Sequence, residues 1–276
     1  MPPNRPGLLK AVRQQPNPLY YHPKRILFIW TPKCACTNIL WWYFWHCGLS
    51  HAAAFYHPWP HRFRMHVLRH SATYQNWLNQ IQPKETRAIQ FVRDPINRCI
   101  SSYRHALRTD FIWDHIQSVM KERVSPETGF SLQFFLDYLN KYGVTGDIDV
   151  HCRSQVPSAR KFFDIEIVDV DNFDLFAVFD KIEDQMNMSK SDIENDRRLQ
   201  KINERHNAKK QDVQSVDETT VFTRSDAINA WPDLASHISN RAREYISEIY
   251  KADYKFISER PKMRGLDQCR GRGVQV

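Results

Sequence analysis

Residues 26–48 read ILFIWTPKCACTNILWWYFWHCG. The apolar run 26–30 has the length and composition of a buried strand. The apolar run 39–47 is long enough for about three helical turns. Gly48 stands where a helix C-terminus favours glycine. The pattern therefore predicts a strand, a loop over residues 31–38 and a buried helix.

The loop TPKCACTN joins the end of this strand to the N-terminus of the helix. A helix N-terminus presents unpaired backbone N–H groups at the positive end of the helix dipole, so the loop predicts an anion site. Lys33 adds a positive charge, and Thr37 and Asn38 add side-chain donors. The sequence lacks the nucleoside-triphosphate pattern G-x-x-x-x-G-K-[ST]. Taken alone, the loop is equally compatible with a capped helix and an exposed lysine.

A second strand-to-helix motif lies at residues 87–104, RAIQFVRDPINRCISSYR. Its first six residues read as a buried strand, Asp94 is a suitable N-cap, and Pro95 occupies the first helical position. Apolar residues then recur at three- and four-residue spacing, which indicates an amphipathic helix. Arg93 directly follows the strand, and Ser101 lies two turns into the helix.

Together the two motifs resemble the cofactor motifs of the PAPS-dependent sulfotransferases. The likeness is closest to the carbohydrate (Golgi-type, sulfotransferase family 2-like) enzymes and their bacterial relatives. The resemblance implies an α/β fold: a P-loop-like, mainly parallel sheet flanked by helices in a single domain. It also implies transfer of a sulfuryl group from PAPS (3′-phosphoadenosine 5′-phosphosulfate) to an acceptor hydroxyl on a carbohydrate, without a metal.

In that family the first motif holds the 5′-phosphosulfate and the second holds the 3′-phosphate. By resemblance, the residues on the 5′ side are Lys33, Cys34, Ala35, Cys36, Thr37 and Asn38. Arg93 and Ser101 correspond to the residues that bind the 3′-phosphate. Lys33 is also a catalytic candidate, because its charge would stabilise the negative charge that develops on the leaving phosphate.

Sulfuryl transfer needs a base for the acceptor hydroxyl, and histidine suits this task near neutral pH. The histidines between residues 50 and 80 have irregular spacing and no carboxylate among them, so we predict no metal site there. Related heparan 2-O-type enzymes carry a histidine upstream of the strand of the second motif. By its distance from Arg93, His70 matches that position best, and His66 is the second choice.

Two later segments carry candidates for acceptor binding. Residues 149–155, DVHCRSQ, resemble the family's His-Trp-x-Pro-Gln segment, with a cysteine for the tryptophan and a serine for the proline. His151 is therefore a candidate for acceptor binding or an alternative base, and a structural histidine is equally compatible. Residues 204–210, ERHNAKK, resemble a loop that precedes the last helices in relatives. It makes Lys209 a candidate contact, although a solvated helix and loop fits the same residues.

The length of 276 residues suits one large domain or two small ones. We assign residues 1–24 to an N-terminal extension, 25–258 to the sulfotransferase-like domain and 259–276 to a basic tail that we expect to be disordered. Within the domain, residues 165–170 and 175–179 read as two further strands.

No run of 18 or more apolar residues and no apolar signal core occur in the sequence, so neither a transmembrane helix nor a signal peptide is predicted. The six cysteines show neither C-x-x-C nor zinc spacing and indicate a reducing compartment. The Golgi members carry an N-terminal membrane anchor, so this chain is either a cytoplasmic, bacterial member or one from which the anchor was removed. The starting methionine favours the cytoplasmic, bacterial protein.

Two other classes of protein remain open. A nucleotide kinase with a degenerate P-loop would need Mg-ATP and a magnesium-binding hydroxyl, for which Thr37 is available. A non-catalytic polyanion-binding module fits the net charge of +8 and would bind with steep salt dependence. The expected partner is a glycan or another hydroxyl-bearing acceptor, and no nucleic acid is expected.

Overall fold

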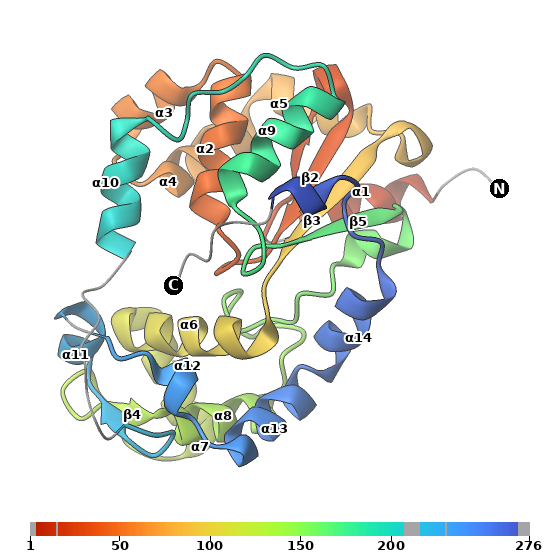
Figure 1. Ribbon diagram of the computed structural model, residues 1–276. Coiled ribbons are helices and arrows are strands. Elements are labelled where there is room, and N and C mark those ends of the chain that lie inside the picture. The colour runs from red at the N-terminus through yellow and green to blue at the C-terminus, as the bar shows by residue number, and fades with distance from the viewer. Residues whose placement is uncertain (1–3, 15, 207–215, 230, 270–276) are drawn as a thin grey trace. The chain divides into compact units, whose positions relative to one another are not determined.

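The computed structural model describes residues 4–14, 16–206, 216–229 and 231–269. It confirms the predicted α/β class, with a mainly parallel sheet flanked by helices (Figure 1). The chain forms two compact units. Unit 1 comprises residues 1–92, 156–201 and 259–276, and unit 2 comprises residues 93–155 and 202–258.

The sheet of unit 1 has the strand order β1-β2-β3-β5. Its strands are β1 (Leu19–Tyr21), β2 (Ile26–Trp30), β3 (Arg87–Val92) and β5 (Ile165–Asp169). β1 pairs antiparallel with β2, whereas the pairs β2–β3 and β3–β5 are parallel. Because β2 and β3 are parallel neighbours, with Trp30 opposite Phe91, the segments that follow both strands begin at the same edge of the sheet.

The helices of unit 1 surround this sheet. Its α-helices are α1 (Arg5–Arg13), α2 (Cys36–His46), α3 (Ser50–Tyr56), α4 (Pro60–His66), α5 (Ala72–Asn79) and α9 (Leu175–Gln185). Its short 3₁₀ turns are His22–Lys24, Leu68–His70, Pro83–Glu85, Ser158–Lys161 and Leu266–Cys269. α10 (Arg197–His206) begins in unit 1.

Every residue of β2 is buried, as the apolar run predicts. Aromatic rings connect the strands to two helices: Phe28 of β2 meets Trp42 of α2 at 4.9 Å between ring centroids, and Phe91 of β3 meets Phe179 of α9 at 6.1 Å. Gly48 ends α2 as predicted. It has a φ of +67° and donates to Trp45, while Leu49 donates to Phe44, which is the Schellman arrangement.

The prediction of a strand at residues 175–179 is wrong, because these residues form the first turns of α9. Asp174 caps this helix, accepting hydrogen bonds from the backbone N–H groups of Phe176 and Ala177 at 2.9 Å each. The apolar run fits a strand by composition, but the cap fixes a helix start directly before it.

Residues 260–269, for which we expected disorder, pack onto unit 1. Met263 donates to the carbonyl of Ile167 in β5, and Ile167 donates to the carbonyl of Pro261. The side chains of Met263, Leu266 and Cys269 are buried. These apolar residues, spaced three apart within a basic segment, account for the order. Residues 270–276 lie outside the described part of the chain.

Unit 2 is a helical cluster with one small antiparallel sheet. Its elements are α6 (Pro95–Arg108), a 3₁₀ turn (Asp110–Ile112), α7 (Trp113–Met120), β4 (Phe130–Ser131), α8 (Leu132–Tyr142), β6 (Val221–Phe222), α11 (Arg224–Asn229), α12 (Leu234–His237), α13 (Asn240–Ile249) and α14 (Lys251–Glu259). Its core joins apolar side chains of α6, α8 and α13. These three helices lie together in Figure 1.

A buried carboxylate ties α9 to α2 within unit 1. Glu183 is fully buried and accepts hydrogen bonds from the indole N–H of Trp42 at 2.7 Å and the backbone N–H of Ser191 at 3.1 Å, and its Oε1 lies 3.0 Å from His46 Nε2. Burial opposes ionisation of Glu183, but these hydrogen bonds outweigh it and lower its pKa. Its stabilising contribution is therefore present above the unfolded-state pKa and is lost as the pH falls through the folded-state pKa.

We expect Glu183→Ala to lower the free energy of unfolding by about 3–5 kcal/mol, because it leaves buried polar partners unsatisfied. Asp184→Ala is the control, since Asp184 is exposed and pairs with Lys190 at the surface. The control should change stability by no more than about 0.5 kcal/mol. Urea unfolding measures the free energy of unfolding of both variants. Equal losses in the two variants would contradict the assigned role of Glu183.

Candidate functional site

The loop between β2 and α2 has an unusual backbone. Lys33 and Ala35 both adopt left-handed conformations, with φ of +74° and +54°. A left-handed conformation is unfavourable for residues other than glycine, and such strain is typical of functional loops. Left-handed residues also occur in anion-binding nests, in which successive backbone N–H groups turn towards one concave side.

No side chain caps the N-terminus of α2 among the described residues, although Asp94, Ser71 and Ser131 cap the helices α6, α5 and α8. The first N–H groups of a helix have no partner inside the helix. The uncapped start of α2 next to Lys33 is therefore suited to an anionic ligand.

Polar atoms of the same loop are buried without protein partners. Thr31 Oγ1 and Asn38 Oδ1 make no hydrogen bond within the described part of the chain. Burial raises the pKa of the Cys36 thiol, against the opposing effect of the charges of Lys33 and Arg64. Cys36 is thus a neutral thiol at pH 7, and the loop has a net positive charge.

The second motif has the predicted change from a strand to a helix, and its helix α6 lies in unit 2. Asp94 caps α6 by accepting from the backbone N–H groups of Ile96 at 2.9 Å and Asn97 at 3.1 Å, and Pro95 is the first helical residue. The side-chain amide of Gln155 bonds both backbone groups of Arg93, the N–H and the carbonyl, at 2.9 Å each. Gln155 therefore fixes the backbone of Arg93.

Gln155 is itself held by a buried charged pair. The carboxylate of Asp253 accepts from the backbone N–H of Gln155 at 2.9 Å and from the hydroxyl of Ser154. Arg98 lies 3.7 Å from the same carboxylate, and both side chains are fully buried. Burial raises the pKa of Asp253, while the positive charge of Arg98 opposes this shift. Sequence reasoning missed this pair, because the two residues lie far apart in the sequence.

The two adjacent serines of α6 differ. Ser102 donates its hydroxyl to the carbonyls of Arg98 and His151, so it has a structural role. Ser101, the predicted 3′-phosphate ligand, is only partly buried on the same helix.

His151 is tied into unit 2 at several atoms. Its Nδ1 lies 2.8 Å from the carboxylate of Asp149, and the centroid of its ring lies 3.7 Å from the ring centroid of His105. Burial opposes ionisation of Asp149, but hydrogen bonds and charge from His151 outweigh it and lower the pKa of Asp149. A carboxylate that accepts from Nδ1–H leaves Nε2 of a neutral imidazole as the proton acceptor. The arrangement is compatible with both roles considered for His151.

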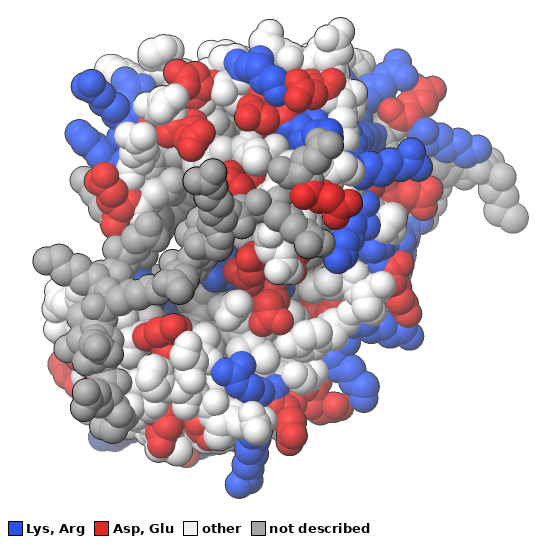
Figure 2. Space-filling view, in the orientation of Figure 1, with Lys and Arg blue, Asp and Glu red and all other residues white. Residues whose placement is uncertain are grey.

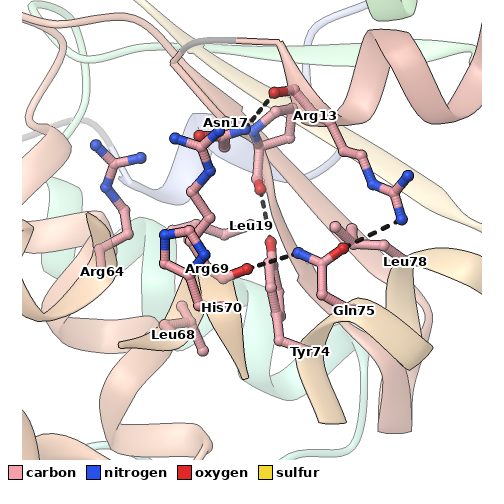
Figure 3. A pocket seen from close by; sticks show the side chains of 11 residues that line it. Arg13, Asn17, Leu19, Arg64, Leu68, Arg69, His70, Tyr74, Gln75 and Leu78 are labelled. Carbon is pink, nitrogen blue, oxygen red and sulfur yellow. Dashed lines mark hydrogen bonds between the residues drawn. The ribbon is translucent and has the colours of Figure 1, made fainter. Parts of the chain in front are cut away.

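The two candidate bases differ in their surroundings. His70 lines a cavity of about 350 Å³ in unit 1 (Figure 3). Both histidines are exposed, and His66 does not line this cavity; its Nδ1 lies 3.3 Å from the hydroxyl of Tyr56. The cavity is also lined by Arg64, a buried residue that sequence reasoning missed because α4 shows no motif around it.

Lys209 lies outside the described residues. Within the described residues, no cluster of three or more His, Cys, Asp or Glu side chains could hold a metal ion. No helix in this part of the chain combines the length and the hydropathy needed to cross a membrane.

Comparison with known families places the chain in one class of protein. The model of the sulfotransferase family matches residues 19–257, so the chain belongs to the sulfotransferase family. Sulfuryl transfer is the activity of this class. Neither the curated proteins nor the solved structures include a match to this chain.

We expect Arg98→Met to lower the free energy of unfolding by about 3–5 kcal/mol, because it leaves the buried carboxylate of Asp253 without its charged partner. The double variant Arg98→Met/Asp253→Asn should lose less than the sum of the single variants. Urea unfolding tests this. Lys251→Met, in an exposed pair with Glu248, is the control. Strict additivity would show that the two side chains are not coupled.

Proposed function

We propose that this protein transfers the sulfuryl group of PAPS to an acceptor hydroxyl, which we expect on a carbohydrate. The observation that carries the proposal is the strained, uncapped and cationic loop after β2 in a member of the sulfotransferase family. In this proposal Lys33, Cys34, Ala35, Cys36, Thr37 and Asn38 hold the 5′-phosphosulfate, and Arg93 and Ser101 bind the 3′-phosphate. The parallel pairing of β2 with β3 supports this, because the segments after both strands begin at one edge of the sheet.

The proposed reaction is a displacement at sulfur. The acceptor oxygen forms a bond to sulfur while the bond from sulfur to the phosphate oxygen breaks, and adenosine 3′,5′-bisphosphate (PAP) leaves with the electron pair. Lys33 and the N–H groups at the start of α2 stabilise the negative charge on that phosphate. His70 takes the proton of the acceptor hydroxyl. Its position in the wall of a cavity supports this choice over His66.

A polyanion-binding module would use a concentrated basic patch. On the face drawn in Figure 2, basic and acidic side chains are interspersed instead. His151 and Lys209 remain proposed acceptor contacts. A cytoplasmic location in a bacterium remains a prediction.

We expect PAP to raise the melting temperature of the protein more than AMP does, because only PAP carries a 3′-phosphate. Arg93→Ala should reduce PAP affinity by about 10- to 100-fold, the effect of losing a hydrogen bond to a charged group, and leave AMP binding unchanged. Arg108→Ala, at the exposed end of α6, is the control. Equal responses to PAP and AMP, or a response to Mg-ATP alone, would overturn the proposed function.

We expect His70→Ala to lower kcat by about 100- to 10,000-fold, the usual contribution of a general base. His66→Ala should change it by only a few fold. The measurement is the initial rate of sulfuryl transfer from radiolabelled PAPS to a glycan identified by screening. A large loss in His66→Ala with His70→Ala active would assign the base to His66.

A further inference from the structure

The side chain of Gln155 pairs with the backbone of Arg93 as a neighbouring strand would. Its Oε1 accepts from the backbone N–H of Arg93, and its Nε2 donates to the carbonyl of the same residue, at 2.9 Å each. A strand partner satisfies the N–H and carbonyl groups of a residue in a similar way. β3 ends at Val92. Gln155 therefore orders the residue that directly follows the strand.

Gln155 and Arg93 differ in their access to solvent. Gln155 is only 1% exposed, so losing either hydrogen bond would leave a buried polar group unsatisfied. Arg93 is only partly buried. The arrangement thus fixes the backbone of Arg93 from the protein interior and leaves part of the residue accessible to a ligand.

The segment that carries Gln155 is held by a charged side chain at each end. Asp253, in the first turn of α14, accepts from the backbone N–H of Gln155 at 2.9 Å. Arg98 of α6 donates to the carbonyl of His151 at 3.2 Å and to the carbonyl of Arg153. Because Arg98 and Asp253 also form a buried pair with each other, the two helices fix this segment together.

Two hydroxyl groups hold the same segment at further points. Tyr250, between α13 and α14, donates to the carbonyl of Cys152 at 2.9 Å. Ser102 of α6 donates to the carbonyl of His151 at 2.6 Å. The side chains of Tyr250 and Ser102 are both buried. A continuous set of hydrogen bonds therefore runs from the start of α14 to the residue proposed to bind the 3′-phosphate.

Such a connection matters for an arginine that binds phosphate. The guanidinium group recognises phosphate through a planar fork of N–H donors, so its affinity depends on orientation. An arginine side chain also has high rotamer entropy, and ordering it on binding lowers affinity. A backbone that is fixed before the ligand arrives reduces this cost, because fewer bonds remain to be ordered.

We propose that Gln155 is a positioning residue for the 3′-phosphate site, which holds the backbone of Arg93 and is itself held by Asp253. Gln155 acts through Arg93 and does not contact the nucleotide. The inference rests on the proposed function, because Arg93 has this role only if PAP binds. It adds that the preference for PAP over AMP depends on a buried residue 62 positions further along the chain.

The ratio of the affinities for PAP and AMP isolates the contribution of the 3′-phosphate. Calorimetric titrations measure both affinities on the full chain. A variant that is merely less stable loses PAP and AMP affinity by the same factor, so the ratio does not report stability. Gln155→Met keeps a similar volume and removes both hydrogen bonds to Arg93. We expect it to lower the ratio about tenfold, as when a residue that orients a ligand-binding side chain is removed, and to leave AMP affinity unchanged.

Two further variants accompany this one. Gln155→Asn covers the case in which Gln155→Met does not fold: its buried amide is shorter by a methylene group and cannot bond both backbone groups of Arg93, so the ratio should fall as well. Tyr103→Phe is the matched control. It removes another buried hydrogen bond of unit 2, from the Tyr103 hydroxyl to the carbonyl of Phe130 at 2.6 Å, and should leave the ratio unchanged.

A double variant tests whether Gln155 acts through Arg93. In Arg93→Ala there is no guanidinium to position. Adding Gln155→Met to Arg93→Ala should therefore lower the ratio by no more than about twofold, because two residues that act as a unit are not additive.

The outcomes distinguish the inference from the function on which it rests. Wild-type protein that prefers PAP, with the same preference in the folded Gln155 variants, overturns the inference alone. So does an equal loss in Tyr103→Phe, which would show a general structural effect, or a further tenfold loss in the double variant, which would show that Gln155 acts independently of Arg93. Wild-type protein without a preference for PAP overturns the proposed function, and the inference fails with it.

Discussion

The parallel pairing of β2 with β3 is the constraint on which the arrangement of unit 1 depends. Parallel strands end at the same edge, so this pairing alone brings the start of the cationic loop and the end of β3 to neighbouring positions. The aromatic contacts of Phe28 and Phe91 then anchor α2 and α9 against the paired strands. The strand before Lys33 determines where its charge lies, so the order of the sheet sets the position of the cationic loop.

The two motifs differ in how their backbones are held. The loop after β2 keeps left-handed residues and an uncapped helix start, whereas the segment after β3 is satisfied by Asp94 and Gln155. The first N–H groups of an uncapped helix can gain partners from a bound ligand, whereas the backbone of Arg93 already has its partner in Gln155. The buried pair of Arg98 and Asp253 stabilises the segment after β3, because Asp253 holds Gln155 in place.

Local sequence signals predicted the strands β2 and β3, the stop at Gly48 and the cap at Asp94, because each depends on a few adjacent residues. The run at 175–179 was misassigned, because its apolar composition fits a strand and a helix equally, and only the Asp174 cap separates them. Arg64 and Asn17 could not be predicted as neighbours, since their proximity depends on how α4 packs beside Trp30. Contacts between distant segments have no signature in a single sequence.

The division of the chain has a consequence for biosynthesis. Neither unit is contiguous: β5 follows the whole of residues 93–155, and the segment that pairs with Ile167 follows residues 202–258. A ribosome therefore releases β2 and β3 long before their sheet can be completed, and the half-formed sheet exposes an unpaired edge in the meantime. Sheets whose strands are distant in the sequence fold slowly and are prone to aggregation. The order of the segments therefore implies a need for chaperones during synthesis.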